Sequence, residues 1–121
     1  MNSWNSISSN LDTILFSCGF KYKLPLDFIS KFECKLNSHP AILPRDPGST
    51  PIRKRFNENP NNIFGATLHH INKDIDQGEI IHQIEFVNKN FNLKELHNFI
   101  FQVIEPKTII QGLKKINLIN I

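Results

Sequence analysis

Apolar residues occur along the chain in short runs whose spacing alternates between the period of a strand and the period of a helix. Residues 12–18 are apolar and β-branched near their start, and Gly19 follows them, which is typical of a strand covered on both faces. Pro25 then precedes residues 26–32, whose apolar positions fall on one helical face. This pattern predicts a strand followed by a short helix.

The rest of the chain continues the alternation. Asn92 and Glu95 have the spacing of a capping box, so a helix is expected from Leu93 onward. Pro106 is expected to kink or interrupt that helix. Strands are predicted at 12–18, 34–38, 63–71 and 79–87, and helices at 26–32, 52–57 and 93–116. This order predicts an α/β fold with a mostly parallel sheet and an antiparallel strand near the end.

Composition and charge exclude several classes of protein. Hydrophobic residues make up 40% of the 121 residues, which is the mixture of one globular domain, expected here at 11–121 after a loose leader at 1–10. A net charge of +3 is too small to indicate nucleic-acid binding. No apolar run approaches the ~20 residues of a membrane helix. Two cysteines without CxxC spacing are typical of a reduced, cytoplasmic protein.

Asn37 and His39 are the first candidates for chemistry. They lie two residues apart in an extended segment, so their side chains point to the same side, and Pro40 ends the strand directly after them. Ligands of open α/β sheets bind beyond the carboxyl ends of the strands. An amide donor beside an imidazole suits the stabilisation of an oxyanion and the transfer of a proton. The alternative is a histidine hydrogen-bonded in a turn with Asn37 as a cap.

A polar loop at 72–78 supplies the second candidate. Asp76 stands two residues before Gly78, which can take the positive φ of a tight turn. A carboxylate here can orient His39 and favour its protonated form. The alternative is an ordinary surface turn.

Zinc binding is a competing interpretation of the same residues. His39, His69, His70 and Asp76 offer suitable ligands. However, His69 and His70 would face opposite sides of a strand, and no pair has the spacing of a known zinc motif. No metal is therefore expected.

The cationic residues form one cluster. Helical periodicity scatters residues 53–55 around a helix, so a solvated face is the simpler interpretation. The alternative is a contact with a phosphate on a substrate. The cluster consists of Arg45, Arg53, Lys54 and Arg55.

Four segments stand together in an order that is specific. They are NSHPAILP at 37–44, Pro-Gly at 47–48, GATLH at 65–69 and IDQGEII at 75–81. This set closely resembles the folate-dependent formyltransferases, which include the glycinamide ribonucleotide, methionyl-tRNA and sugar-nucleotide N-formyltransferases. The resemblance covers residues 11–116 and implies a Rossmann-like sheet.

The resemblance implies a role for each matching residue. Asn37 would polarise the formyl oxygen of the cosubstrate 10-formyltetrahydrofolate, His39 would stabilise charge and carry a proton, and Asp76 would tune His39. His69 would approach this site. The pterin ring would lie between the loops at 19–25 and 72–76. The residues expected to bind it are Gly19, Phe20, Leu24, Asn72, Asp74 and Ile75.

The chain also departs from this family. Further strands normally precede the one at residue 12, so the resemblance covers only the C-terminal part of the catalytic domain. An apolar strand edge is then left open to pair with a complementing chain or a second copy. The expected activity is formyl transfer to a primary amine, with a sugar-nucleotide amine slightly favoured. The alternative is a non-catalytic or partner-dependent remnant.

Overall fold

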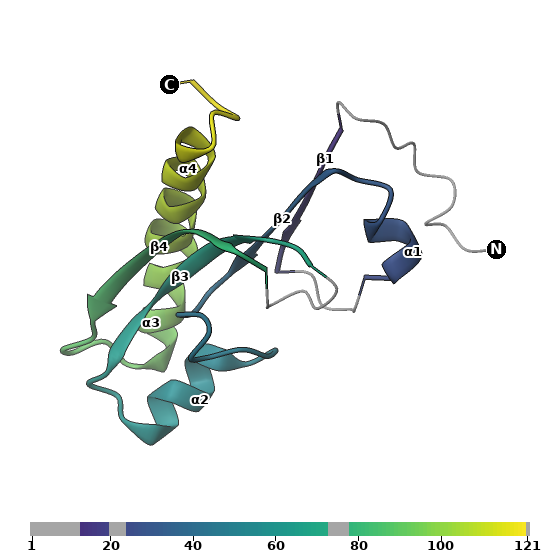
Figure 1. Ribbon diagram of the computed structural model, residues 1–121. Helices are drawn as coiled ribbons and strands as arrows, with labels where there is room; N and C mark the ends of the chain where they lie inside the picture. Colours follow the sequence, from purple (N-terminus) through teal and green to yellow (C-terminus); the bar gives the residue numbers. More distant parts are fainter. Residues whose placement is uncertain (1–12, 20–23, 73–77, 121) are drawn as a thin grey trace.

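A four-stranded sheet in the order β1-β2-β3-β4 organises the chain in the computed structural model, which describes residues 13–19, 24–72 and 78–120 (Figure 1). All four predicted strands are present. The strands are β1 (Ile14–Cys18), β2 (Cys34–His39), β3 (Ile63–His70) and β4 (Ile80–Val87). The helices are α1 (Leu26–Ile29), α2 (Pro51–Glu58), α3 (Leu93–Phe99), the π-helical segment η2 (Ile100–Ile104) and α4 (Glu105–Lys115).

The sheet has one parallel pair and two antiparallel pairs. β1 and β2 are parallel, whereas β2 with β3 and β3 with β4 are antiparallel. The predicted α/β class is confirmed, but the antiparallel portion is larger than the single strand near the end that the sequence predicts. The cause is the connection between β2 and β3. A parallel return needs a crossover over a sheet face, whereas α2 lies at one end of the sheet, so β3 runs back beside β2 (Figure 1).

Helices cover both faces of the sheet in part. On one face, Leu36 and Leu68 pack against Leu113 of α4. Gly112 permits this close approach, because a Cβ at that position would lie 2.4 Å from Leu68 Cδ2. On the other face, α1 covers a second apolar cluster. Its buried residues are Leu24, Phe28, Ile29, Phe32 and Ile71.

The C-terminal helical segment is continuous from α3 through α4. Asn92 and Glu95 form the predicted capping box, with reciprocal bonds of 2.9 and 3.0 Å. Instead of an interruption at Pro106, the turn before it widens, and the Glu105 N–H donates to the Ile100 carbonyl five residues back. This π-helical turn accommodates the missing N–H and the ring of Pro106. Within the described residues, no helix has the length and apolar character needed to cross a membrane.

The edge strand β1 is the least covered part of the sheet. β2 is its only neighbour among the described strands. Ile14 is 43% exposed and Phe16 is 39% exposed, although both belong to an apolar strand. Neither the outer edge of β1 nor one of its faces is buried by the described part of the chain.

Candidate active site

Polar residues form a row across three strands on the sheet face that α1 partly covers. Ser17 of β1 pairs with Asn37 of β2, and Asn37 pairs with His69 of β3. Residues paired in this way point to the same side of a sheet. Ser17 and Asn37 are each 6% exposed and His69 is fully buried. The register therefore brings a hydroxyl, an amide and an imidazole together in the interior.

His69 holds the amide of Asn37 in a defined orientation. The Asn37 Nδ2 atom lies 3.0 Å from His69 Nε2, and His69 Nδ1 lies 2.9 Å from the His70 carbonyl oxygen. A carbonyl oxygen only accepts, so Nδ1 carries the hydrogen and Nε2 of the neutral ring accepts from Asn37. The Asn37 nitrogen has a second hydrogen. That hydrogen is a donor that a developing oxyanion could use.

His39 is fixed at the end of the same strand. Its Nε2 atom donates to the Asp46 carbonyl oxygen at 2.7 Å, so the lone pair of the neutral ring is on Nδ1. Thr67, which pairs with His39 across the sheet, holds the loop that follows. Its hydroxyl donates to the Ala41 carbonyl at 2.8 Å and accepts from the Leu43 N–H at 3.2 Å.

Asp46 anchors the loop that contacts His39. Its carboxylate accepts from Arg45 Nη2 at 2.7 Å and from Arg55 Nε at 3.1 Å, and it also pairs with Arg55 Nη2. Burial alone would raise the pKa of Asp46, but the hydrogen bonds and charges of Arg55 and Arg45 outweigh burial and lower it. Two of the four clustered cationic residues, Arg45 and Arg55, therefore form ion pairs with Asp46. The solvated-face interpretation holds only for Arg53 and Lys54, which are exposed.

A buried carboxylate lies behind the strand that carries the candidate site. Ser38 points to the opposite face from its two neighbours, and its hydroxyl donates to Glu105 Oε2 at 2.7 Å. Burial raises the pKa of Glu105, although hydrogen bonds from Ser38 and Cys18 and the charge of His39 oppose the shift. Burial and the nearby Glu105 charge also raise the pKa of the Cys18 thiol. Glu105 therefore links α4 to the end of β2.

Replacing Glu105 with Gln should stabilise the fold at neutral pH. The raised pKa means that the folded state holds the proton more tightly than the unfolded state. The protonated carboxyl therefore contributes its full stability at pH values below 4.5, the ordinary pKa of Glu. That contribution is lost as the pH rises through the folded-state pKa of Glu105. Gln keeps an oxygen that accepts from Ser38 and cannot ionise.

Denaturant unfolding of both proteins between pH 4 and pH 8 measures this difference. The advantage of Glu105→Gln should be small at pH 4 and should grow with pH. An advantage that is the same at every pH would contradict the raised pKa of Glu105.

The structure places some of the residues that the sequence singled out. Asn37 and His39 share one sheet face at the end of β2, and His69 contacts Asn37. Gly19 has φ +66°, Leu24 packs in the apolar cluster beneath α1, and Asn72 is exposed just after β3. Other candidates lie outside the described residues, so the convergence of Asp76 with His39 stays a prediction. These are Phe20, Asp74, Ile75 and Asp76.

Sequence reasoning missed three polar residues near the site. Ser17 is a polar residue one position before the end of the apolar strand β1, and that interruption is a signal that could have identified it. Asp46 and Glu105 were missed because Arg55 and Ser38 reach them through contacts between separate elements. In the described ranges, no three His, Cys, Asp or Glu side chains are grouped as metal ligands.

Comparisons with known proteins match one family. The model of the formyl transferase family matches residues 9–110. The chain is 33% identical over 90 residues to formyltetrahydrofolate deformylase of Bacillus subtilis, which covers 73% of this chain and 29% of that protein. It is 28% identical over 118 residues to methionyl-tRNA formyltransferase of Borrelia garinii, covering 96% of this chain and 37% of that protein.

Solved structures show the same fold. Phosphoribosylglycinamide formyltransferase from Bacillus halodurans superposes with a TM-score of 0.76 at 25% identity, covering 85% of this chain and 53% of that one. The enzyme of the same name from Anaplasma phagocytophilum gives 0.74 at 25% identity, covering 84% and 50%. The chain thus spans about half of these structures and 37% or less of the two curated relatives above.

Proposed function

The chain belongs to the formyl transferase family, and from this premise we propose that its site takes the formyl group of 10-formyltetrahydrofolate and passes it to a primary amine. The observation that carries the proposal is the geometry at the end of β2. The Asn37 amide, oriented by His69, lies on the same strand face as His39. An oriented donor beside an imidazole is the arrangement that acyl transfer to an amine requires.

Each residue has a defined step in this reaction. The amine nitrogen attacks the formyl carbon, a C–N bond forms, and the formyl oxygen becomes negative. The free hydrogen of the Asn37 amide stabilises that oxygen. The bond from the formyl carbon to N10 of the folate then breaks, and N10 gains a proton. His39 carries the proton lost by the attacking amine, and Asp76 tunes His39 and helps to accept that proton.

The two binding partners follow from the same premise. The folate binds with its pterin ring between the loops that begin at Gly19 and Asn72. The acceptor is the amine of a sugar nucleotide, because the PGSTP segment at 47–51 and the GATLH segment resemble that branch of the family. No metal takes part in the proposed step.

Water is a second candidate acceptor. The observation that favours it is the similarity to formyltetrahydrofolate deformylase. With water as the nucleophile, a C–O bond forms in place of the C–N bond, and the corresponding tetrahedral intermediate releases formate when the bond to N10 breaks. The identity of the one-carbon product, formamide or formate, separates the two reactions.

The proposed enzyme also needs a partner segment. The outer edge of β1 has no neighbour among the described strands, and unpaired edges of this kind pair with other strands. We therefore propose that strands from another polypeptide segment, or from a second copy, complete the sheet. A chain that lacks such a partner would be the non-catalytic remnant.

Replacing Asp76 with Asn should separate catalysis from binding. A residue that tunes a proton carrier acts mainly in the transition state, so kcat should fall by about 10²-fold or more. The dissociation constant for the folate should change by less than about threefold, because Asn keeps the shape of Asp. Steady-state kinetics and equilibrium binding measure the two effects.

Glu79→Gln is the matched control, since it removes an exposed carboxylate just after the same loop. It should leave kcat largely unchanged. Equal losses of kcat and folate affinity in Asp76→Asn would assign that residue a structural role.

A further inference from the structure

A pocket of about 170 Å³ lies just beyond the candidate site, where the chain leaves β2. Pro40, the residue directly after His39, forms part of its wall. The rest of the wall comes from the start of α2 and from the C-terminal helical segment, in which His97 and Phe101 lie one turn apart. None of the lining residues takes part in the transfer step proposed above.

One wall of this pocket is aromatic. The rings of His97 and Phe101 are parallel, with an interplanar angle of 1° and centroids 6.0 Å apart. Phe101 is 46% exposed, so its ring is accessible to a ligand. Pro40 and Ile52 add apolar surface to the same space. Because planar heterocycles stack on aromatic side chains, this wall suits a nucleobase.

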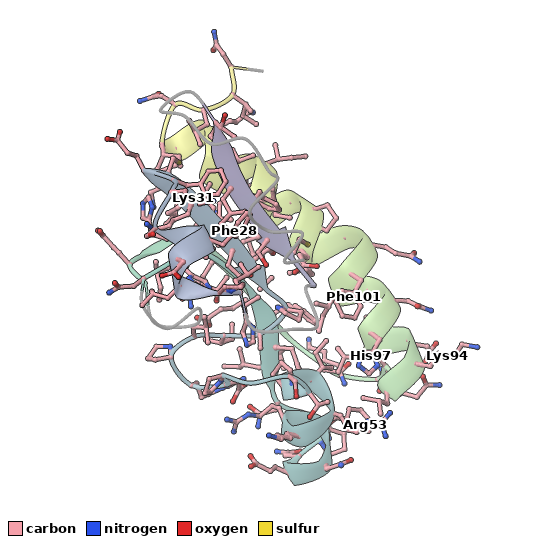
Figure 2. The ribbon with its side chains drawn as sticks, turned by 90° about the vertical axis from the view of Figure 1, so that its right-hand side faces the viewer. Phe28, Lys31, Arg53, Lys94, His97 and Phe101 are labelled. Carbon is pink, nitrogen blue, oxygen red and sulfur yellow. The ribbon has the colours of Figure 1, made fainter. Side chains whose placement is uncertain are left out.

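A cationic side chain stands at the rim of the pocket. Figure 2 shows Arg53 of α2 next to His97 and Phe101, and all three line the pocket. Unlike the two arginines that pair with Asp46, Arg53 has no ion pair or hydrogen bond with any described residue. Among the described residues that line the pocket there is one arginine and no Asp or Glu. A phosphate group is the ligand that complements this charge.

The size of the pocket limits which part of a ligand it can hold. Pockets for whole ligands usually measure about 300 to 1,000 Å³, so this one has room for a single ring. The rest of the ligand must extend outward, past the cation at the rim. Since Pro40 adjoins His39, one direction out of the pocket leads to the candidate site. A ring, then phosphates, then a sugar that carries the amine is the order of groups in a sugar nucleotide.

We propose that this pocket binds the nucleotide part of the acceptor, with the base stacked on Phe101 and the diphosphate bonded to Arg53. The proposal rests on the proposed function, because it takes the bound nucleotide to carry the reacting amine. The sugar then extends past Pro40 toward His39. Binding of this non-reacting part of the acceptor positions the amine for attack on the formyl carbon.

Two probes, UDP and uridine, test the pocket without any need for turnover. Arg53→Gln should weaken the binding of UDP by about tenfold and leave the binding of uridine unchanged, because uridine has no phosphate. Phe101→Ala should weaken the binding of both by about tenfold, because both carry the base. Both residues are exposed, so the variants should fold. Titration of the chain, with any partner that completes its sheet, gives the dissociation constants.

Two exposed residues provide matched controls. Lys94 lies on α3 one turn before His97 and does not line the pocket (Figure 2). Lys94→Gln removes the same charge as Arg53→Gln, so it should leave UDP binding unchanged if Arg53 acts by direct contact. Phe91 is 38% exposed and also lies outside the pocket lining. Phe91→Ala should therefore leave the binding of both probes unchanged.

The outcomes separate this assignment from the proposed function. The assignment is wrong if UDP does not bind, if both pocket variants bind it as well as the unaltered chain, or if Lys94→Gln weakens binding as much as Arg53→Gln. Release of the formyl group to an amine or to water, measured separately, would in those cases leave the proposed function standing. UDP binding with the expected pattern but no formyl transfer would keep the nucleotide pocket and overturn the proposed function.

Discussion

Replacing Asn37 with Asp should lower kcat for formyl transfer by about 10²- to 10³-fold, which is the loss measured when one oxyanion donor is removed from other enzymes. Asp has the shape of Asn and can fill the same space. It offers no N–H to the formyl oxygen, however, and its negative charge would repel the developing oxyanion. The affinity for the folate should change far less than kcat, because the lost interaction is strongest in the transition state.

Two further variants sharpen this prediction. Asn37→Ala should also be strongly impaired, because it lacks the donor, but less so than Asn37→Asp, because it carries no charge that repels the oxyanion. Asn61→Ala changes an exposed asparagine before the start of β3 and serves as the matched control. A kcat within about threefold of the unaltered chain in Asn37→Asp would remove Asn37 from the catalytic step.

The 121-residue polypeptide should not persist as a stable monomer on its own. The outer edge of β1 is unpaired within the described residues, and Ile14 and Phe16 expose 43% and 39% of their surface. Each apolar side chain left uncovered forfeits roughly 1.5 to 3 kcal/mol. A domain is typically stable by only about 5 to 15 kcal/mol, so a few such losses remove most of the margin. Sedimentation at micromolar concentration should therefore show self-association, aggregation or binding to an added partner.

Two phenylalanines allow a matched test of this edge. Phe16 on β1 and Phe91 before α3 are exposed to a similar extent, 39% and 38%. Phe16→Lys should reduce self-association, because edge charges oppose strand pairing, whereas Phe91→Lys should not. A cooperative melt of a clean monomer would show that the unaltered chain closes its edge by itself.

Local patterns predicted the parts of the molecule that depend on local contacts. One example is the capping box of Asn92 and Glu95, and another is the shared strand face of Asn37 and His39. The two residues of each pair lie within three positions of each other in the sequence. Of the two effects expected of Pro106, a kink or an interruption, the interruption is not observed, because the helix continues through a wide π-helical turn just before the proline.

Contacts between distant residues could not be predicted in this way. The hydrogen bond between Ser38 and Glu105 joins residues 67 positions apart in the sequence, and the bond between Asn37 and His69 joins residues 32 positions apart. The antiparallel return of β3 belongs to the same class, since it depends on where α2 lies. Ser17 is visible in the sequence as a polar residue in an apolar strand, but only the three-dimensional structure shows that its buried hydroxyl has no hydrogen-bond partner among the described residues.

The central claim is that this site transfers a formyl group, and one labelling experiment tests it most directly. 10-Formyltetrahydrofolate labelled with ¹³C in the formyl group is mixed with a nucleoside-diphosphate amino sugar and the chain. A polypeptide carrying the portion of a family member that this chain does not span is added to complete the sheet. We expect the label to appear as a formamide on the sugar, in step with the release of tetrahydrofolate, and to appear about 10²- to 10³-fold more slowly with Asn37→Asp. Label that stays on the folate, with the sheet completed, would contradict the account.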